Sequence, residues 1–146
     1  MMFGGVASLN LDSKGRLAIP ARHRDALGIH CANQLVITAE PSGCLLIYPT
    51  PDWLPVRDQL NRLSGAQMPI RRFIVGHAEE IEPDSAGRIL IPPRLRQLAG
   101  LDKEVALVGM GNKFELWDEA RWAAQIQAVM DISPDDLAKQ MQDIVL

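Results

Sequence analysis

The residues best suited to chemistry in this sequence are arginines that occur in two copies of one motif. Asp-Ser-x-Gly-Arg, followed by Ile-Pro and two more arginines, covers residues 12–24 and recurs 72 positions later at residues 84–96. A guanidinium group keeps its charge and donates hydrogen bonds from a planar fork, which suits phosphate groups and guanine edges. Because a repeated unit predicts an internal two-fold axis, we expect the two copies to occupy equivalent places and to share one function.

Arg16 and Arg88 close the two motifs, and two interpretations of them are open. Each arginine follows an aspartate, Asp12 or Asp84, by four positions, so it can form a structural ion pair across the turn. Alternatively, each lies exposed at the tip of a β-hairpin and reaches a phosphate or a base edge. In both interpretations the local turn decides where the guanidinium points.

Four residues are predicted to shape these turns rather than to do chemistry: Asp12, Gly15, Asp84 and Gly87. The aspartate opens the turn and can accept backbone N–H bonds two residues on, and the glycine supplies the positive φ that a hairpin with a bulge needs. A short strand follows, and the Ile-Pro step then starts a short helix. We expect these helices to end at Gly28 and Gly100, where glycine can adopt a left-handed cap.

Each motif leads into the same series of short elements. Apolar runs at residues 35–38 and 105–108 are followed by a turn and by a second run that ends near a tryptophan. Each unit is therefore predicted as strand, tight turn, strand, short helix, strand, turn, strand and helix, which is an α+β pattern. We expect two pseudo-symmetric halves of β-hairpins and short helices that form a compact β-barrel-like core, with C-terminal helices attached.

The charge of the chain is unevenly distributed. The 146 residues carry a net charge of −3 and lack the overall basic excess of a typical nucleic-acid binder. Residues 1–96 hold 11 basic and 9 acidic side chains, whereas residues 97–146 hold 4 and 9. A basic face on an acidic body is compatible with DNA binding, particularly when several subunits present it together.

Other classes of function are not favoured. The apolar runs are far shorter than the roughly 20 residues of a membrane span, and no basic flank precedes an apolar stretch at the N-terminus, so we expect no secretory signal and a cytoplasmic protein. Cys31, in an expected turn, and Cys44, in an apolar strand, are predicted as buried or incidental thiols. The three histidines lack metal-ligand spacing, so we expect no metal, no cofactor and no small-molecule substrate.

Together these motifs resemble the MraZ family of bacterial transcriptional regulators. The resemblance is carried by both Asp-Ser-x-Gly-Arg motifs, by Gly-His-Ala at residues 76–78 and by Asn-Lys-Phe-Glu-Leu-Trp at residues 112–117. It implies two AbrB-like (SpoVT-AbrB) halves in one chain and a ring-shaped homo-oligomer. It also implies binding to short direct repeats of double-stranded DNA ahead of the division and cell-wall gene cluster, including the protein's own promoter, and hence a nucleoid-associated location.

The resemblance assigns DNA contact to Arg16 and Arg88, which close the family's DxxxR motifs. The candidate DNA-binding residues are basic side chains of the two copies: Lys14, Arg16, Arg22, Arg24, Arg88 and Arg94. Lys14 is matched by Ala86 in the second copy, so we expect the first turn to attract phosphates more strongly. No residue is assigned a catalytic role.

The remaining segments flank the two repeats. We assign residues 6–52 and 78–121 to SpoVT-AbrB-like repeats 1 and 2, residues 53–77 to a helical linker, and residues 122–146 to a C-terminal helical tail. In the tail, Ser133 and Pro134 are typical of a capped helix start, and an apolar stripe follows. We expect this stripe to pack against its own domain, with contact to another subunit as the alternative.

Two other functions compete with DNA-binding regulation. An antitoxin-like interaction protein would use the tail to bind a partner, because the AbrB-like fold also serves that role. An enzyme would use Asp12 and Asp84 as an acid pair brought together by the internal symmetry. Backbone donors in each turn lower the pKa of these carboxyls and oppose a shared proton, so we expect no enzyme.

Overall fold

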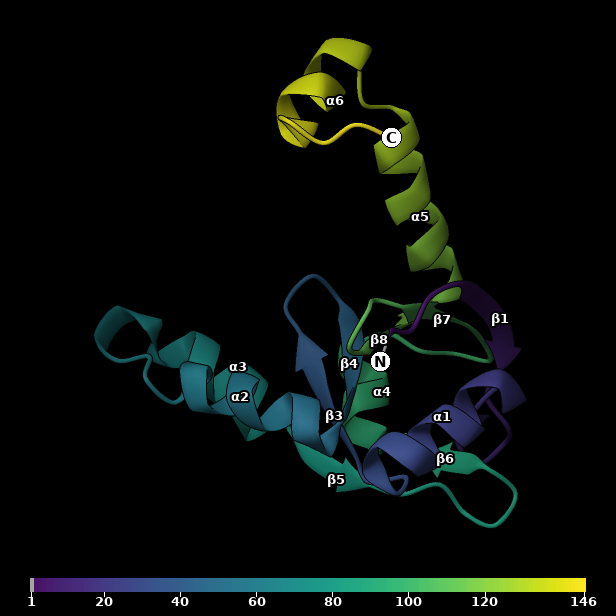
Figure 1. The fold of residues 1–146 in the computed structure, drawn as a ribbon. Coiled ribbons are helices and arrows are strands. Elements are labelled where there is room, and N and C mark those ends of the chain that lie inside the picture. Colours follow the sequence, from purple (N-terminus) through teal and green to yellow (C-terminus); the bar gives the residue numbers. More distant parts are fainter. Residues whose placement is uncertain (1) are drawn as a thin grey trace.

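Eight strands and six α-helices make up the part of the chain that the computed structural model describes, residues 2–146 (Figure 1). The strands are β1 (Val6–Asn10), β2 (Arg16–Ala18), β3 (Leu35–Glu40), β4 (Cys44–Pro49), β5 (Glu79–Ile81), β6 (Arg88–Leu90), β7 (Glu104–Gly109) and β8 (Phe114–Asp118). The helices are α1 (Ala21–Cys31), α2 (Thr50–Leu60), α3 (Met68–Gly76), α4 (Pro93–Leu98), α5 (Glu119–Met130) and α6 (Pro134–Met141), with a 3-10 turn (Gly65–Gln67) before α3. The α+β class expected from the sequence is confirmed.

A six-stranded antiparallel sheet forms the body, in the order β1-β7-β8-β4-β3-β5. The first strand of each repeat pairs with the third strand of the other repeat, since β1 pairs with β7 and β5 pairs with β3. The second strands, β2 and β6, pair with each other as a separate two-stranded ribbon. The two halves therefore exchange strands. The core is barrel-like, and β1 and β5 form the two edges of the sheet.

Two hydrophobic clusters cover the two faces of the sheet. The larger cluster joins the ribbon, the sheet, α1 and α4, and Leu17 and Ile89 within it are fully buried. The smaller cluster lies under α2 and the start of α5, where Trp53 is buried. Because side chains alternate along a strand, β3 directs Ile37 into the first cluster and Val36 into the second. Strands β3 and β4 are therefore buried on both faces, whereas the edge strands β1 and β5 are not.

Helix α1 continues past the end that the sequence suggests. Gly28 lies inside the helix, which runs to Cys31 and is followed by Ala32 in a left-handed conformation (φ 51). Leu27 and Cys31 lie one turn apart and are both buried, and the Cys31 thiol donates to the Leu27 carbonyl at 3.2 Å. The expectations that Gly28 caps this helix and that Cys31 lies in a turn are wrong, because burial of the added turn favours its continuation. Gly100 does adopt a positive φ of 60° just after α4.

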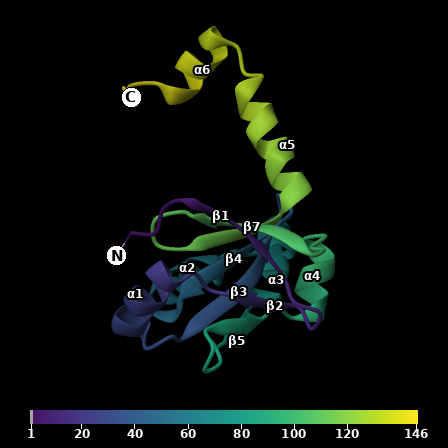
Figure 2. The same cartoon turned by 90° about the vertical axis from the view of Figure 1, so that its right-hand side faces the viewer.

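Two helical arms project from the body (Figures 1 and 2). α2 and α3 extend from one side of the body, whereas α5 rises away from it and carries α6 at its far end. Trp122 packs against Trp117 at a ring-centroid distance of 6.2 Å, but no residue of α5 or α6 is buried. The expectation that the tail packs against its own domain is therefore wrong beyond Trp122. Within residues 2–146 the helices are too short or too polar to cross a membrane.

His23 breaks the otherwise apolar packing of α1 against the core. Its ring is buried and lies 4.9 Å from the ring centroid of Phe114 and 5.7 Å from that of Phe3. Burial lowers the pKa of His23 from its usual 6.5, and the nearby charge of Arg22 adds to this effect. The second repeat has the buried Leu95 at the equivalent position.

We expect His23→Leu to reduce the acid sensitivity of the fold. A histidine whose pKa is lowered by folding must release its proton to fold, so its neutral form contributes fully above pH 6.5 and stability falls as the pH drops below that value. Urea unfolding of both proteins between pH 7 and pH 5 should show a smaller loss of unfolding free energy in the variant. Parallel pH curves for the two proteins would contradict this assignment.

Candidate nucleic-acid interface

The two Asp-Ser-x-Gly-Arg motifs fold into nearly identical turns. The Oδ1 atom of Asp12 accepts the backbone N–H groups of Lys14 and Arg16, both at 2.9 Å, and its Oδ2 atom accepts Nε of Arg16 at 2.7 Å. Asp84 accepts the matching backbone bonds at 2.9 Å and Nε of Arg88 at 3.1 Å. The structure therefore contains the ion pair in both repeats, and each carboxylate fixes the direction of its arginine.

Arg16 and Arg88 share the outer face of the β2–β6 ribbon. In its register Leu17 pairs with Ile89, and Arg16 pairs with Leu90. Because Leu17 and Ile89 point into the core, alternation directs Arg16, Arg88 and Leu90 outward. The two arginines are then diagonal neighbours on one face, a relation that separates Cα atoms by about 7–8 Å.

The arginines lie within the ribbon and not at hairpin tips, because β1 and β2 join different sheets after the turn closes. Antiparallel pairing also puts the two turns at opposite ends of the ribbon. The N–H of Ile19 donates to the carbonyl oxygen of Gly87 at 2.9 Å, and the N–H of Ile91 donates to the carbonyl oxygen of Gly15 at 3.0 Å. Gly15 and Ile19 are four residues apart in extended chain, roughly 13 Å, so the two aspartates do not form the acid pair considered for an enzyme.

The other basic residues of the two motifs differ between the repeats in the turn and match at the helix starts. Lys14 is exposed in the first turn, where its counterpart is Ala86. Arg22 and Arg94 occupy matching exposed positions at the starts of α1 and α4, and Arg94 also lines a groove of about 480 Å³ beside Arg72. The hydrogen bond to the aspartate uses Nε of Arg16 and of Arg88, and within residues 2–146 their Nη atoms form no hydrogen bond. A ribbon with this outward face can present guanidinium groups to phosphates or base edges.

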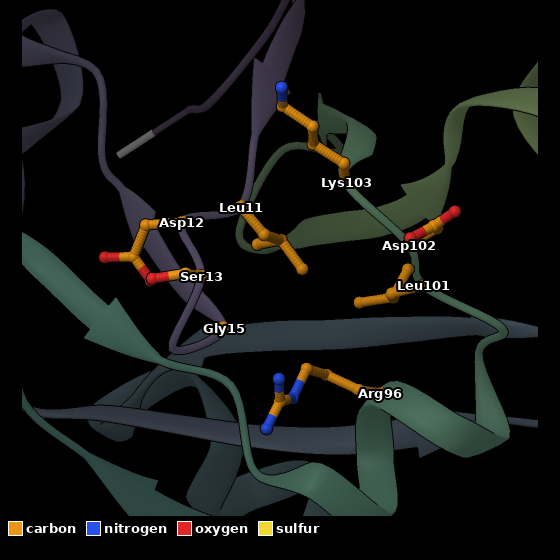
Figure 3. Close-up of a pocket in the computed structure, with 8 residues that line it drawn as sticks. All are labelled: Leu11, Asp12, Ser13, Gly15, Arg96, Leu101, Asp102 and Lys103. Atoms are coloured by element: carbon orange, nitrogen blue, oxygen red, sulfur yellow. The ribbon is translucent and has the colours of Figure 1, made fainter.

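Arg24 and Arg96 occupy matching positions two residues further along α1 and α4, and each lies against the turn of the opposite repeat. Arg24 lines a groove of about 620 Å³ with Asp84 and Gly87. Arg96 lines a groove of about 540 Å³ with Asp12, Ser13, Gly15, Leu101 and Lys103, and Figure 3 shows its guanidinium below Gly15. Arg24 is among the DNA-binding residues predicted from the sequence, whereas Arg96 is not. The repeat spacing of 72 residues was the available signal, because it maps Arg24 onto Arg96.

The turn geometry keeps both aspartates ionised. The backbone N–H of Arg16 lowers the pKa of Asp12 most strongly, and its side chain and the N–H of Lys14 add to this, bringing the pKa from 3.8 to about 2. The equivalent bonds from Arg88 and Ala86 lower the pKa of Asp84. At neutral pH each turn therefore holds a negative carboxylate against a positive guanidinium.

The comparisons with known proteins agree with one another over both repeats. A family model described as "MraZ protein, putative antitoxin-like" matches residues 2–73 and again residues 74–145. The chain is 47% identical to a protein of Thiobacillus denitrificans and 52% identical to one of Dechloromonas aromatica, each over 99% of this chain and 100% of the relative. A protein of Chromobacterium violaceum is 49% identical with the same coverage. All three relatives are named "Transcriptional regulator MraZ".

We expect the carboxyl of Asp12 to titrate with a midpoint near pH 2 and that of Asp84 to titrate below 3.8. Because these values are lowered by folding, the stabilisation by each aspartate is present above about pH 3.9 and is lost as the pH falls through the folded-state value. Carboxyl ¹³C shifts measured from pH 7 to pH 1.5 test this. Arg16→Ala should raise the midpoint of Asp12 only partway, since the backbone donors stay in place. A midpoint for Asp12 near 3.8 in the unsubstituted protein would refute the turn geometry.

Proposed function

Because the chain belongs to the MraZ family, we propose that it is a DNA-binding transcriptional regulator that uses the outer face of the β2–β6 ribbon. The observation that carries the proposal is the placement of Arg16 and Arg88 on that face, each oriented by its own aspartate. The names of the relatives support the regulatory role. Residues 6–52 and 78–121 are the repeat units that contribute the two arginines.

The ribbon suits the major groove of duplex DNA. That groove admits a two-stranded β-ribbon, and arginine is the commonest partner of guanine O6 and N7. Arg16 and Arg88 contact base edges or phosphates through their Nη groups. Lys14, Arg22 and Arg94 are exposed basic residues of the same two repeats, and we assign them to phosphate contacts that position the protein without reading sequence. Arg24, the remaining sequence-based candidate, lies against Gly87, so we assign it to the second turn instead of to phosphate.

The proposed target is a set of short direct repeats ahead of the division and cell-wall gene cluster, including the protein's own promoter. Such a regulator works in the cytoplasm at the nucleoid. Direct repeats match a ring of identical subunits, because rotated copies bring the same ribbon face to successive sites. One copy alone carries only a small basic face on a chain of net charge −3. Several attached copies therefore strengthen binding by avidity.

The two helical arms support the proposed homo-oligomer. The α5–α6 arm carries large apolar side chains that are exposed in one copy: Ile126, Val129, Met130 and Leu137. The α2–α3 arm exposes Leu54 and Ile70. Exposed apolar surface of this kind marks an interaction site.

The charges of the two arms are complementary. Residues 119–146 contain five acidic and two basic side chains, whereas residues 50–77 contain four basic and two acidic ones. The α5–α6 arm of one copy therefore fits the α2–α3 arm of the next. Contact between two different surfaces of identical chains generates a ring when the rotation closes.

One alternative function is also compatible with the exposed arm. The family description includes the words "antitoxin-like", and an exposed α5–α6 arm would also serve a protein partner of that kind. We propose no enzymatic role, because the relatives are named as transcriptional regulators and the ribbon holds Asp12 and Asp84 apart.

We expect Arg16→Ala to weaken binding to the DNA upstream of the protein's own gene while leaving the fold intact. A specific arginine contact is worth about 1–3 kcal/mol, or roughly 5- to 150-fold per engaged subunit. The Arg16–Asp12 ion pair is partly exposed. Ion pairs near the surface contribute only about 0–1 kcal/mol to stability, so the melting temperature should change little. Fluorescence anisotropy with the upstream DNA and a scrambled duplex measures the affinity. Lys113→Ala is the control, because it removes one positive charge from the β7–β8 turn. Unchanged affinity of Arg16→Ala would overturn the proposed site.

We expect Val129→Asp with Met130→Asp to reduce the size of the oligomer. Both side chains are mostly exposed in one copy, at 60% and 74%, and a charge there is disfavoured in an apolar contact. Light scattering coupled to size exclusion measures the mass. Ala124→Asp adds a charge to the opposite side of α5, given about 100° per residue, and should leave the mass unchanged. Equal masses for the unsubstituted protein, the double variant and Ala124→Asp would contradict this interface.

A further inference from the structure

The space above each turn glycine is filled by an arginine of the other repeat. A methyl group built on Gly15 would lie 2.5 Å from Cζ and 2.8 Å from Nε of Arg96. One built on Gly87 would lie 2.6 Å from Cδ and 2.7 Å from Nη1 of Arg24. Both glycines are buried and have φ values of 80° and 75°. Glycine is therefore needed here for its conformation and for the close approach of a guanidinium.

Each of these arginines reaches across the repeat boundary. Nη1 of Arg24 donates to the carbonyl of Ala86 at 3.5 Å, a long bond that joins α1 to the second turn. Arg96 extends from α4 to the first turn, and Figure 3 shows its guanidinium directed toward the loop of Ser13 and Gly15. The two contacts are related by the internal two-fold symmetry. Because the same contact occurs in both halves, it is not an accident of one side chain's placement.

The geometry points to a reciprocal clasp, in which Arg96 positions the first turn with Arg16 and Arg24 positions the second turn with Arg88. In the DNA complex this role rests on the function proposed above. Arg24 and Arg96 are positioning residues that act through Arg88 and Arg16. Each DNA-contacting arginine is then positioned by its own aspartate and by a helix of the opposite repeat. The two halves of the ribbon face therefore reach the DNA-binding arrangement together.

The surroundings of Arg96 favour positioning over a phosphate site. Its Nε atom is buried and has no hydrogen-bond partner among the residues that the structure describes. The groove beside it contains Asp12 and Asp102 as well as Lys103, so opposite charges balance there. A guanidinium packed over a buried glycine stabilises the turn by contact, because its flat face can stack on the flat peptide groups of the turn.

Hydrogen exchange measured by NMR on the full chain without DNA tests the clasp directly. Arg96→Met keeps a long unbranched stem and removes the guanidinium. It should speed exchange of the Gly15 and Arg16 amides by about threefold or more, the lower range of coupling between contacting residues, while the Gly87 and Arg88 amides stay unchanged.

Arg24→Met should give the reverse pattern, and Gln97→Ala, an exposed change on α4, should alter neither turn. The clasp would be overturned if each substitution accelerated exchange in the turn of its own repeat. Equal acceleration in both turns, or no acceleration in either, would also overturn it.

A double-mutant cycle for affinity to the upstream DNA then tests its role in binding. Arg96→Met should weaken binding in the unsubstituted protein and in Arg88→Ala, but should have no further effect in Arg16→Ala. Arg24→Met should show the opposite dependence. Additive effects of Arg96→Met and Arg16→Ala would overturn the positioning role. If Arg16→Ala and Arg88→Ala leave DNA binding unchanged, the proposed DNA site fails, while the exchange pattern still decides whether the clasp exists.

Discussion

Antiparallel pairing of β2 with β6 is the interaction on which the candidate site depends. It places Leu17 opposite Ile89 at the buried centre of the ribbon, so each outward position is set by the alternation of the strand. A shift of one residue would exchange the buried and outward sets. The same pairing brings Gly15 against Ile91 and Gly87 against Ile19, which fixes a turn at each end.

The exchange of strands between repeats makes the ribbon inseparable from the body. β1 and β5 each cross to the sheet half of the other repeat, and the arginine clasp crosses in the same way. Neither repeat encloses its own hydrophobic core, because Leu17 of one and Ile89 of the other lie in a single cluster. The result is a shared base that holds both arginines on one face, while the arms α2–α3 and α5–α6 project from it.

Local features of the fold were predictable from the sequence because short-range chemistry specifies them. An aspartate followed by glycine three positions later defines a turn, and both glycines do adopt a positive φ. The Ser133 side chain caps α6 by accepting the N–H of Asp136 at 3.2 Å, as the helix-start pattern indicates. The prediction for α1 failed where tertiary packing outweighed a local signal, since Cys31 is buried one turn beyond Gly28.

By itself the sequence determined the internal repeat, the turns, the order of short strands and helices, and the family resemblance, all of which follow from residue types at fixed spacing. Only the tertiary structure decided which strands pair, that Arg16 and Arg88 share one face, that Arg96 covers Gly15, and that α5 and α6 stand away from the body. The physical reason is distance along the chain. Leu17 and Ile89 are 72 residues apart, and no local propensity specifies a contact between them; burial of both in one shared core does.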